Sequence, residues 1–384
     1  MQRKPIKIAC IEVTQPIGTF YIGAMDSADL VDISYSDVRR IEERDLEVLS
    51  GIERPLSLKR VTELRQYVTN IDASFPTGII LAIESEHAKY DAHSRTMTID
   101  NESTVAKIID GQHRIDGLKG YAGPTFQLNV TLFVDMDIED QALLFATINL
   151  KQTPVAKSLA YDLFEFAKTR SPQKSSHNIA KLLNGREGSP FYRRIMILGV
   201  ATGQPTETIT QAAFIDRLIG YISTNPMADR DALKRKPTQQ LPKIDGAMIR
   251  VRKLIFRNMW IEDGDAQIAR VLWNYFLAVA ECWPKAWHFK QAGLVLNRTT
   301  GFRALMRFLP VAYLSLGGLD TIVSKEDFRS VFDKVKLSDD DFNPENFIPG
   351  TSGQAKLYRT LETHTRLDEH TTFNPKMPAA PKSA

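Results

Sequence analysis

Apolar positions in roughly the first 155 residues either alternate with polar ones or form short runs, as strands require. Residues 6–13 are rich in Ile and Val, and residues 126–133 alternate, so each stretch predicts a strand. The runs Ile79-Ile-Leu-Ala-Ile and Lys107-Ile-Ile-Asp are short and apolar, which is typical of buried strands. These patterns predict a sheet in the N-terminal part of the chain.

Helical periodicity accompanies these strands. Residues 57–68 predict a helix that Ser57 caps, with its apolar residues on one face. That face consists of Leu58, Val61, Leu64 and Val68. Residues 138–149 are strong helix formers and predict a second helix. The charged stretch 37–49 fits either a helix or an exposed linker.

The pattern changes after about residue 155 and becomes mostly helical. Helical spacing recurs at 160–168, 178–183, 211–222, 247–258, 265–282 and 302–316. Residues 191–198 give an isolated strand signal, and the polar, proline-containing stretch 226–242 predicts a surface loop. We therefore expect an α+β chain with a mixed-sheet domain (1–155), a mostly helical domain (156–370) and a disordered tail (371–384).

Composition and charge exclude several classes of protein. The chain has 49 basic and 46 acidic residues, a net charge of +3, so it is not a charge-driven nucleic-acid binder, although local basic patches remain open. Cys10 and Cys282 form no CxxC pair, which argues against a disulfide framework or a cysteine zinc site. The absence of a long apolar run predicts a cytoplasmic protein with no membrane association. HExxH and GxSxG are also absent, and we assign no metal ligands.

The segment Asp110-Gly-Gln-His-Arg carries the strongest chemical signal. A predicted strand ends at Asp110, Gly111 permits a tight turn, and Gln112, His113 and Arg114 lie at the start of a helix. A helix start favours anions, and a guanidinium suits phosphate oxygens. The pattern indicates an anion site, most simply for a nucleotide phosphate.

A purely structural interpretation of the same residues stays open. Asp110 would then be a helix cap, and Arg114 would pair on the surface with Asp116 or Glu139. Strand–glycine–helix connections are common in mixed folds, and this one lacks the GxxxxGK[ST] of a P-loop.

The pentapeptide resembles the signature of the DGQHR-domain proteins, which include the DndB and DpdB groups. The segment that begins at Phe145 (FATINLKQTPV) also resembles that family's pattern. The resemblance implies a ParB/sulfiredoxin-like N-terminal domain that binds ATP, or another nucleoside triphosphate, with Mg²⁺. It implies nucleotide contacts from residues 111–114, with Asp110, His113 and Arg114 as catalytic residues.

Two functions follow from this resemblance. A DpdB-like protein would hydrolyse ATP and assist a transglycosylase-like partner enzyme that inserts 7-deazaguanine into DNA. A DndB-like protein would be a non-enzymatic, DNA-binding regulator of DNA phosphorothioation. The sequence decides neither this choice nor whether the protein forms a homo-oligomer.

Other polar residues are weaker candidates. Asn149 and Gln152 follow the helix at 138–149 and would contact base or ribose, or only end that helix. Basic residues that would contact DNA phosphates, or simply face solvent, are Arg54, Arg193, Arg194, Lys234, Arg235 and Lys236.

Overall fold

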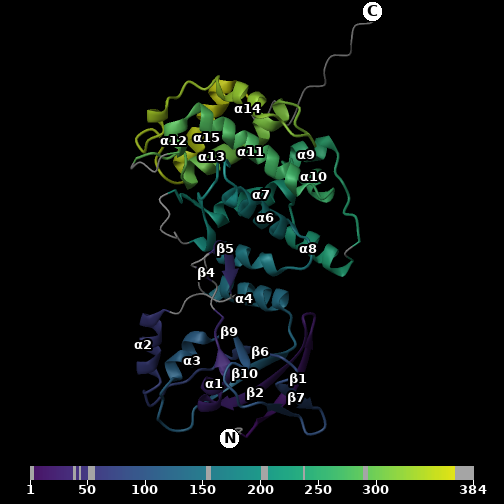
Figure 1. The fold of residues 1–384 in the computed structure, drawn as a ribbon, viewed down its shortest axis with the longest axis vertical. Helices are drawn as coiled ribbons and strands as arrows, with labels where there is room; N and C mark the ends of the chain where they lie inside the picture. The colour runs from purple at the N-terminus through teal and green to yellow at the C-terminus, as the bar shows by residue number, and fades with distance from the viewer. Residues whose placement is uncertain are drawn as a thin grey trace, which may run out of the picture. The chain divides into compact units, whose positions relative to one another are not determined.

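The chain folds into two compact units, Met1–Val155 and Ala156–Ala384 (Figure 1). The computed structural model describes residues 4–37, 40–42, 45–50, 57–152, 157–199, 206–236, 238–288 and 293–367. The proposed tail, 371–384, lies outside these residues. Each unit has its own hydrophobic core.

Unit 1 is built on an eight-stranded mixed sheet with the order β3-β9-β6-β10-β2-β1-β8-β7. The strand pairs β3/β9 and β6/β10 are parallel, and the other neighbours in the sheet are antiparallel. All four strands expected from the sequence are present. The strands are β1 (Ile6–Gln15), β2 (Gly18–Asp26), β3 (Ser34–Tyr35), β6 (Ile79–Ile83), β7 (Ala88–Asp91), β8 (Thr96–Ile99), β9 (Ala106–Asp110) and β10 (Gln127–Val134).

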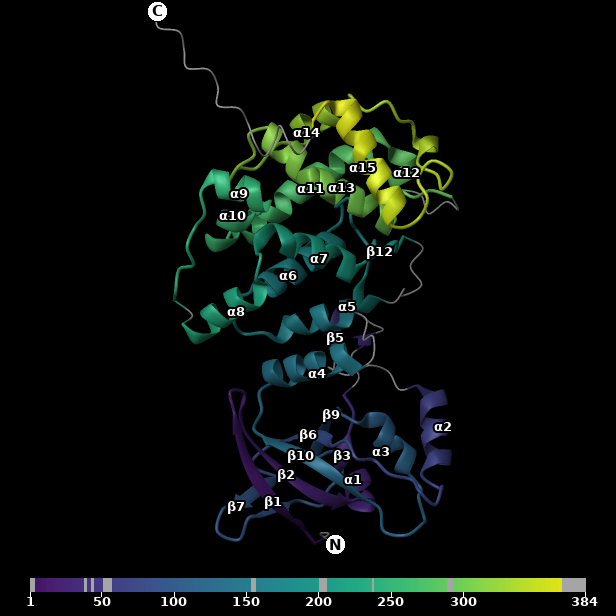
Figure 2. The ribbon, with the colours of Figure 1, turned by 180° about the vertical axis from the view of Figure 1, so that it is seen from behind.

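Four helices accompany this sheet in the described part of unit 1, which Figure 2 shows from behind. They are α1 (Ser27–Ile33), α2 (Leu58–Tyr67), α3 (Gln112–Leu118) and α4 (Ile138–Gln152). Ser57 caps α2 as predicted, since its hydroxyl accepts the Arg60 N–H. Val61 and Val68 are buried, but Leu58 is 81% exposed, so the predicted apolar face is wrong at its first residue. Helix α2 packs on α3, where the absence of a side chain at Gly117 allows close approach to Leu64.

The stretch 37–49 is neither a helix nor a simple linker. Residues Arg40–Glu42 (β4) and Asp45–Ser50 (β5) pair as antiparallel strands. Polar and apolar residues alternate from Asp45 to Val48, a short two-residue period that the high charge density obscured. The prediction for this stretch was therefore wrong.

Unit 2 is mostly helical, as the sequence predicts. Its α-helices are α5 (Lys157–Asp162), α6 (Pro172–Gly185), α7 (Gln211–Ile222), α8 (Pro226–Arg235), α9 (Gly246–Arg252), α10 (Arg257–Ile261), α11 (Asp265–Cys282), α12 (Pro284–His288), α13 (Thr299–Ser315), α14 (Lys325–Phe332) and α15 (Thr351–Thr365). Short 3-10 helices occur at η1 (Leu163–Phe166), η2 (Ile197–Gly199) and η3 (Asp339–Asp341), and β11 (Ile195–Met196) pairs with β12 (Ile209–Thr210).

An aromatic cluster forms the centre of this unit. The rings of Phe191, Phe214, Phe276, Phe302 and Trp287 contact one another with centroids 4.6–6.1 Å apart. All five side chains are fully buried, so this cluster supplies much of the apolar area that stabilises the unit.

Two local predictions in unit 2 were wrong. The expected loop 226–242 begins with helix α8, because Asn225 caps it and Pro226 occupies its first turn, where proline fits. The strand expected over residues 191–198 shrinks to β11, since Phe191 and Arg194 are buried against neighbouring elements instead of alternating along a sheet. Proline and short apolar runs are ambiguous signals without their surroundings.

Within the described residues, no helix combines the length and apolarity that crossing a membrane requires.

The thiol of Cys282 is predicted to react slowly with alkylating agents. Burial raises its pKa to about 11, and nearby Asp333 adds to that effect while Arg329 opposes it. Only the thiolate reacts, so at about pH 8 alkylation by iodoacetamide should be about 100-fold slower than for a thiol with pKa 9. Peptide-resolved mass spectrometry checks the rate, with the urea-unfolded chain as control. A rate that stops rising below about pH 9 would contradict the prediction.

Candidate functional site

The Asp110–Arg114 pentapeptide forms a sharp corner between β9 and α3, here called the DGQHR corner. The β6/β9 register shifts between Ile80 and Leu81, so β9 carries an irregularity just before it ends at Asp110. Gly111 then adopts φ +106°, a left-handed conformation that glycine tolerates. A Cβ there would lie 2.4 Å from Ile79 Cδ1. Any other residue would be strained by this backbone conformation and would have to push the Ile79 side chain aside.

Arg114 connects this corner to the start of β6. Its Nη1 donates to the Thr77 carbonyl at 2.5 Å and to the Thr77 hydroxyl at 2.7 Å. Its Nη2 donates to the Gly78 carbonyl at 3.1 Å and to Asp110 Oδ2 at 2.9 Å. The sequence left open a pair with Asp116 or Glu139, but the observed carboxylate partner is Asp110, while Asp116 pairs with Lys119.

His113 and Gln112 connect the corner to two further elements. The Ser57 N–H donates to His113 Nε2 at 3.0 Å, which joins α3 to the start of α2. The Ser36 hydroxyl donates to Gln112 Oε1 at 3.2 Å, which joins α3 to the segment after β3. Both side chains are buried. These bonds therefore join the corner to three other segments of unit 1.

The electrostatics of the corner combine one carboxylate with two neighbouring guanidinium groups. Burial lowers the pKa of Arg114, Asp110 opposes that change, and the positive charge of Arg60 adds to it. Arg60 is exposed on α2. An exposed cation beside a partly buried one favours an anion, and a phosphate is the common biological choice.

The sequence match to known proteins covers this corner. Residues 8–178 match the model of the DndB family, described as DNA-sulfur modification-associated. This region is similar to DndB. The match includes the β-sheet strands from Ile8 onward, the DGQHR corner and the first helices of unit 2, which is less than half of the chain. No curated protein and no solved structure matched the chain.

Two other predicted nucleotide contacts also fall within the DndB-like region. Asn149 and Gln152 belong to the last turn of α4, rather than following it, and their side chains are not among those described. Arg54 lies outside the described residues.

The predicted DNA contacts beyond the DndB-like region differ in exposure. Arg193 is exposed over the Tyr192 ring, and Lys234, Arg235 and Lys236 are exposed at the end of α8. Arg194 is buried and donates to the Trp287 and His288 carbonyls. Burial removes Arg194 from the candidate DNA-binding residues, because its guanidinium already donates to carbonyls within the protein.

The structure also brings together three residues that the sequence analysis missed. Asp162, Glu165 and His177 offer ligand atoms that all lie within 4.8 Å of one another. The spacing of the two carboxylates, three residues apart in a helical stretch, was visible in the sequence. Such spacing is common on helices, and only the packing of α6 brings His177 to it.

Proposed function

We propose that this protein is a DNA-binding component of a DNA phosphorothioation system and acts as a DndB-like regulator. The match of residues 8–178 to the DndB family carries the proposal. The bonding of Arg114 supports a non-enzymatic role, since four hydrogen bonds already engage its guanidinium within the fold. The signature then serves chiefly to shape the surface around it.

The DNA contact that we propose in unit 1 is Arg60. Its guanidinium is exposed, and its charge acts on Arg114, so positive potential gathers beside the DGQHR corner. Lys234, Arg235 and Lys236 at the end of α8 offer a second basic surface. Contacts of this kind bind the phosphate backbone without reading sequence.

Arg60→Ala is expected to weaken duplex-DNA binding three- to tenfold and to reduce the log K against log [salt] slope by about 1. Fluorescence anisotropy of the full chain with a labelled duplex, repeated over a salt series, measures both quantities. The matched control is Lys59→Ala, because Lys59 is the neighbouring residue on α2, with a side chain 87% exposed. It should change the affinity less than twofold.

The same assay contains the outcomes that would overturn the proposal. A chain that binds no DNA at low salt is not a DNA-binding regulator, because phosphate contacts are strongest there. Equal losses for Arg60→Ala and Lys59→Ala would assign the binding to general surface charge. Alanine at Lys234, Arg235 and Lys236 together tests the second surface in the same way.

Nucleotide hydrolysis is the second candidate function, and the Asp110–Arg114 pair favours it. A carboxylate 2.9 Å from a guanidinium, with the Thr77 hydroxyl beside it, offers a phosphate-binding cation and an acid that would orient water. The nucleotide would be ATP or another triphosphate with Mg²⁺, and the cell process a DpdB-like one with a transglycosylase-like partner.

Calorimetric titration with ATP, ADP, GTP and CTP in Mg²⁺, together with a phosphate-release assay, separates the two functions. Turnover that Asp110→Asn abolishes while ATP still binds would favour the hydrolase. If none of these nucleotides produces heat or releases phosphate, the hydrolase candidate fails and the regulator remains.

A further inference from the structure

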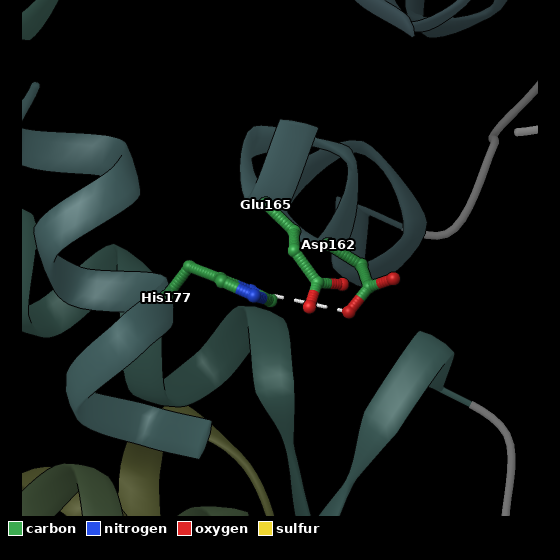
Figure 3. Close-up of side chains that lie close together, drawn as sticks. All are labelled: Asp162, Glu165 and His177. Atoms are coloured by element: carbon green, nitrogen blue, oxygen red, sulfur yellow. Dashed lines mark ion pairs between the residues drawn. The ribbon is translucent and has the colours of Figure 1, made fainter. Parts of the chain in front are cut away.

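Three ionisable side chains from successive helical segments converge inside unit 2. Asp162 is the last residue of α5, Glu165 lies in η1, and His177 lies in α6. Figure 3 shows the imidazole of His177 directed toward the two carboxylates, and the three ligand atoms lie within 4.8 Å of one another. This set is here called the Asp–Glu–His cluster.

The cluster is buried, and burying ionisable groups is energetically unfavourable. Asp162 is 0% exposed and His177 is 1% exposed, while Glu165 is partly exposed and accepts a bond from Lys181 at 2.6 Å. Moving a carboxylate out of water costs several kcal/mol unless charge and hydrogen bonds compensate. A divalent cation shared by both carboxylates and the imidazole would add to the compensation that Gln211 and Lys181 already provide.

The hydrogen bonds of Gln211 indicate the protonation of the His177 imidazole. Its Oε1 accepts the Leu198 N–H at 3.2 Å, which sets the orientation of the amide. Its Nε2 then lies 3.1 Å from His177 Nδ1 and 3.4 Å from Asp162 Oδ1. Because the amide nitrogen is a donor, Nδ1 is an acceptor and the imidazole is neutral. The same Nδ1 lone pair would bind a metal ion, so an ion in the cluster would replace the hydrogen bond from Gln211 to His177.

We propose that Asp162, Glu165 and His177 bind a divalent transition-metal ion, with Zn²⁺ or Mn²⁺ as the best fit to two carboxylate oxygens and one imidazole nitrogen. Ligand bonds of about 2.1 Å place tetrahedral donor atoms about 3.4 Å apart, so small side-chain movements close the site. Gln211 is a positioning residue: it orients His177 and Asp162 in the metal-free site, and it would keep its bond to Asp162 when an ion is bound. The ion would tie α5 and η1 to α6 and stabilise unit 2.

The decisive measurement is the metal content of the full chain without a histidine tag. After treatment with a chelator and separate dialyses against micromolar Zn²⁺ and Mn²⁺, plasma mass spectrometry should find about one ion per chain with at least one of the two metals. Co²⁺ titration should produce visible absorption bands, and Zn²⁺ should raise the midpoint of thermal unfolding. Less than about 0.1 equivalent of Zn²⁺ and of Mn²⁺ would overturn the proposal, whatever any variant does.

The informative variant is Glu165→Gln, and Glu281→Gln is its matched control. The two glutamates have side chains 32% and 34% exposed, and each pairs with a lysine, at 2.6 and 2.8 Å. Glu165→Gln should weaken Zn²⁺ binding at least tenfold, and Glu281→Gln should leave it unchanged. Equal metal content in both variants would place the ion elsewhere and refute the assignment. His177→Gln should remove the Co²⁺ absorption, and circular dichroism shows whether that variant is folded.

Discussion

Arg114→Ala should lower the free energy of unfolding of unit 1 by about 3 kcal/mol, because it breaks a largely buried ion pair. The substitution leaves the Asp110 carboxylate and the Thr77 and Gly78 carbonyls without the donors that now satisfy them. Far-UV circular dichroism in urea and peptide-resolved hydrogen exchange over β6 and β9 measure the loss. Trp fluorescence is an internal control, since all four tryptophans, Trp260, Trp273, Trp283 and Trp287, belong to unit 2.

Arg114→Lys separates charge from geometry at the same position. A lysine keeps the positive charge but cannot reach Thr77, Gly78 and Asp110 together, so it should restore only about 1 kcal/mol. If hydrogen exchange in β6 and β9 is unchanged in Arg114→Ala, the guanidinium does not stabilise the corner. The signature arginine would then be kept for a ligand, which would favour the nucleotide-binding candidate.

Gly301→Ala should destabilise unit 2 by about 3 kcal/mol. The new methyl group would overlap backbone atoms, and moving the backbone of a packed unit costs free energy. A Cβ at Gly301 would lie 2.3 Å from the Leu296 carbonyl oxygen and 2.5 Å from Leu296 Cα. The start of α13 would have to move away from that segment, although most of α13 is buried. Trp fluorescence during urea unfolding measures the change.

Gly220→Ala is the control for this collision. Gly220 is exposed in the last turn of α7, and a Cβ there would meet no atom within 4 Å. Alanine favours a helix over glycine by up to about 1 kcal/mol, so this variant should be slightly more stable than the parent chain. If both variants change stability alike, the close contact at Leu296 does not restrict α13.

Periodicity in the sequence predicted the long amphipathic helices correctly. Residues 211–222 and 265–282 coincide with α7 and α11, since a long amphipathic pattern fits one structure. It was a poor guide where charge or proline outweighed the pattern, as in β5 and α8. Those elements depend on a strand partner and on the Asn225 cap, which composition alone does not reveal.

At the candidate site, too, the sequence predicted the local backbone but not the contacts between distant residues. The sequence located the strand, the turn at Gly111 and the helix after it, because a glycine at a strand–helix connection has few backbone alternatives. It did not identify the partners of Arg114, since Thr77 and Gly78 lie 37 and 36 residues away in the chain. Sequence spacing carries no information about such pairs until the strands pair.

The sequence by itself determined an α+β composition of elements, the glycine turn, the DGQHR signature and a nearly balanced charge. Local propensity and covalent geometry are enough to produce these features. Only the tertiary structure decided that Arg114 bonds within the fold, that Arg194 is buried, and that His177 meets Asp162 and Glu165. The physical reason is that burial and side-chain partners arise from packing between distant segments, whose free energy belongs to the whole unit and not to any single stretch.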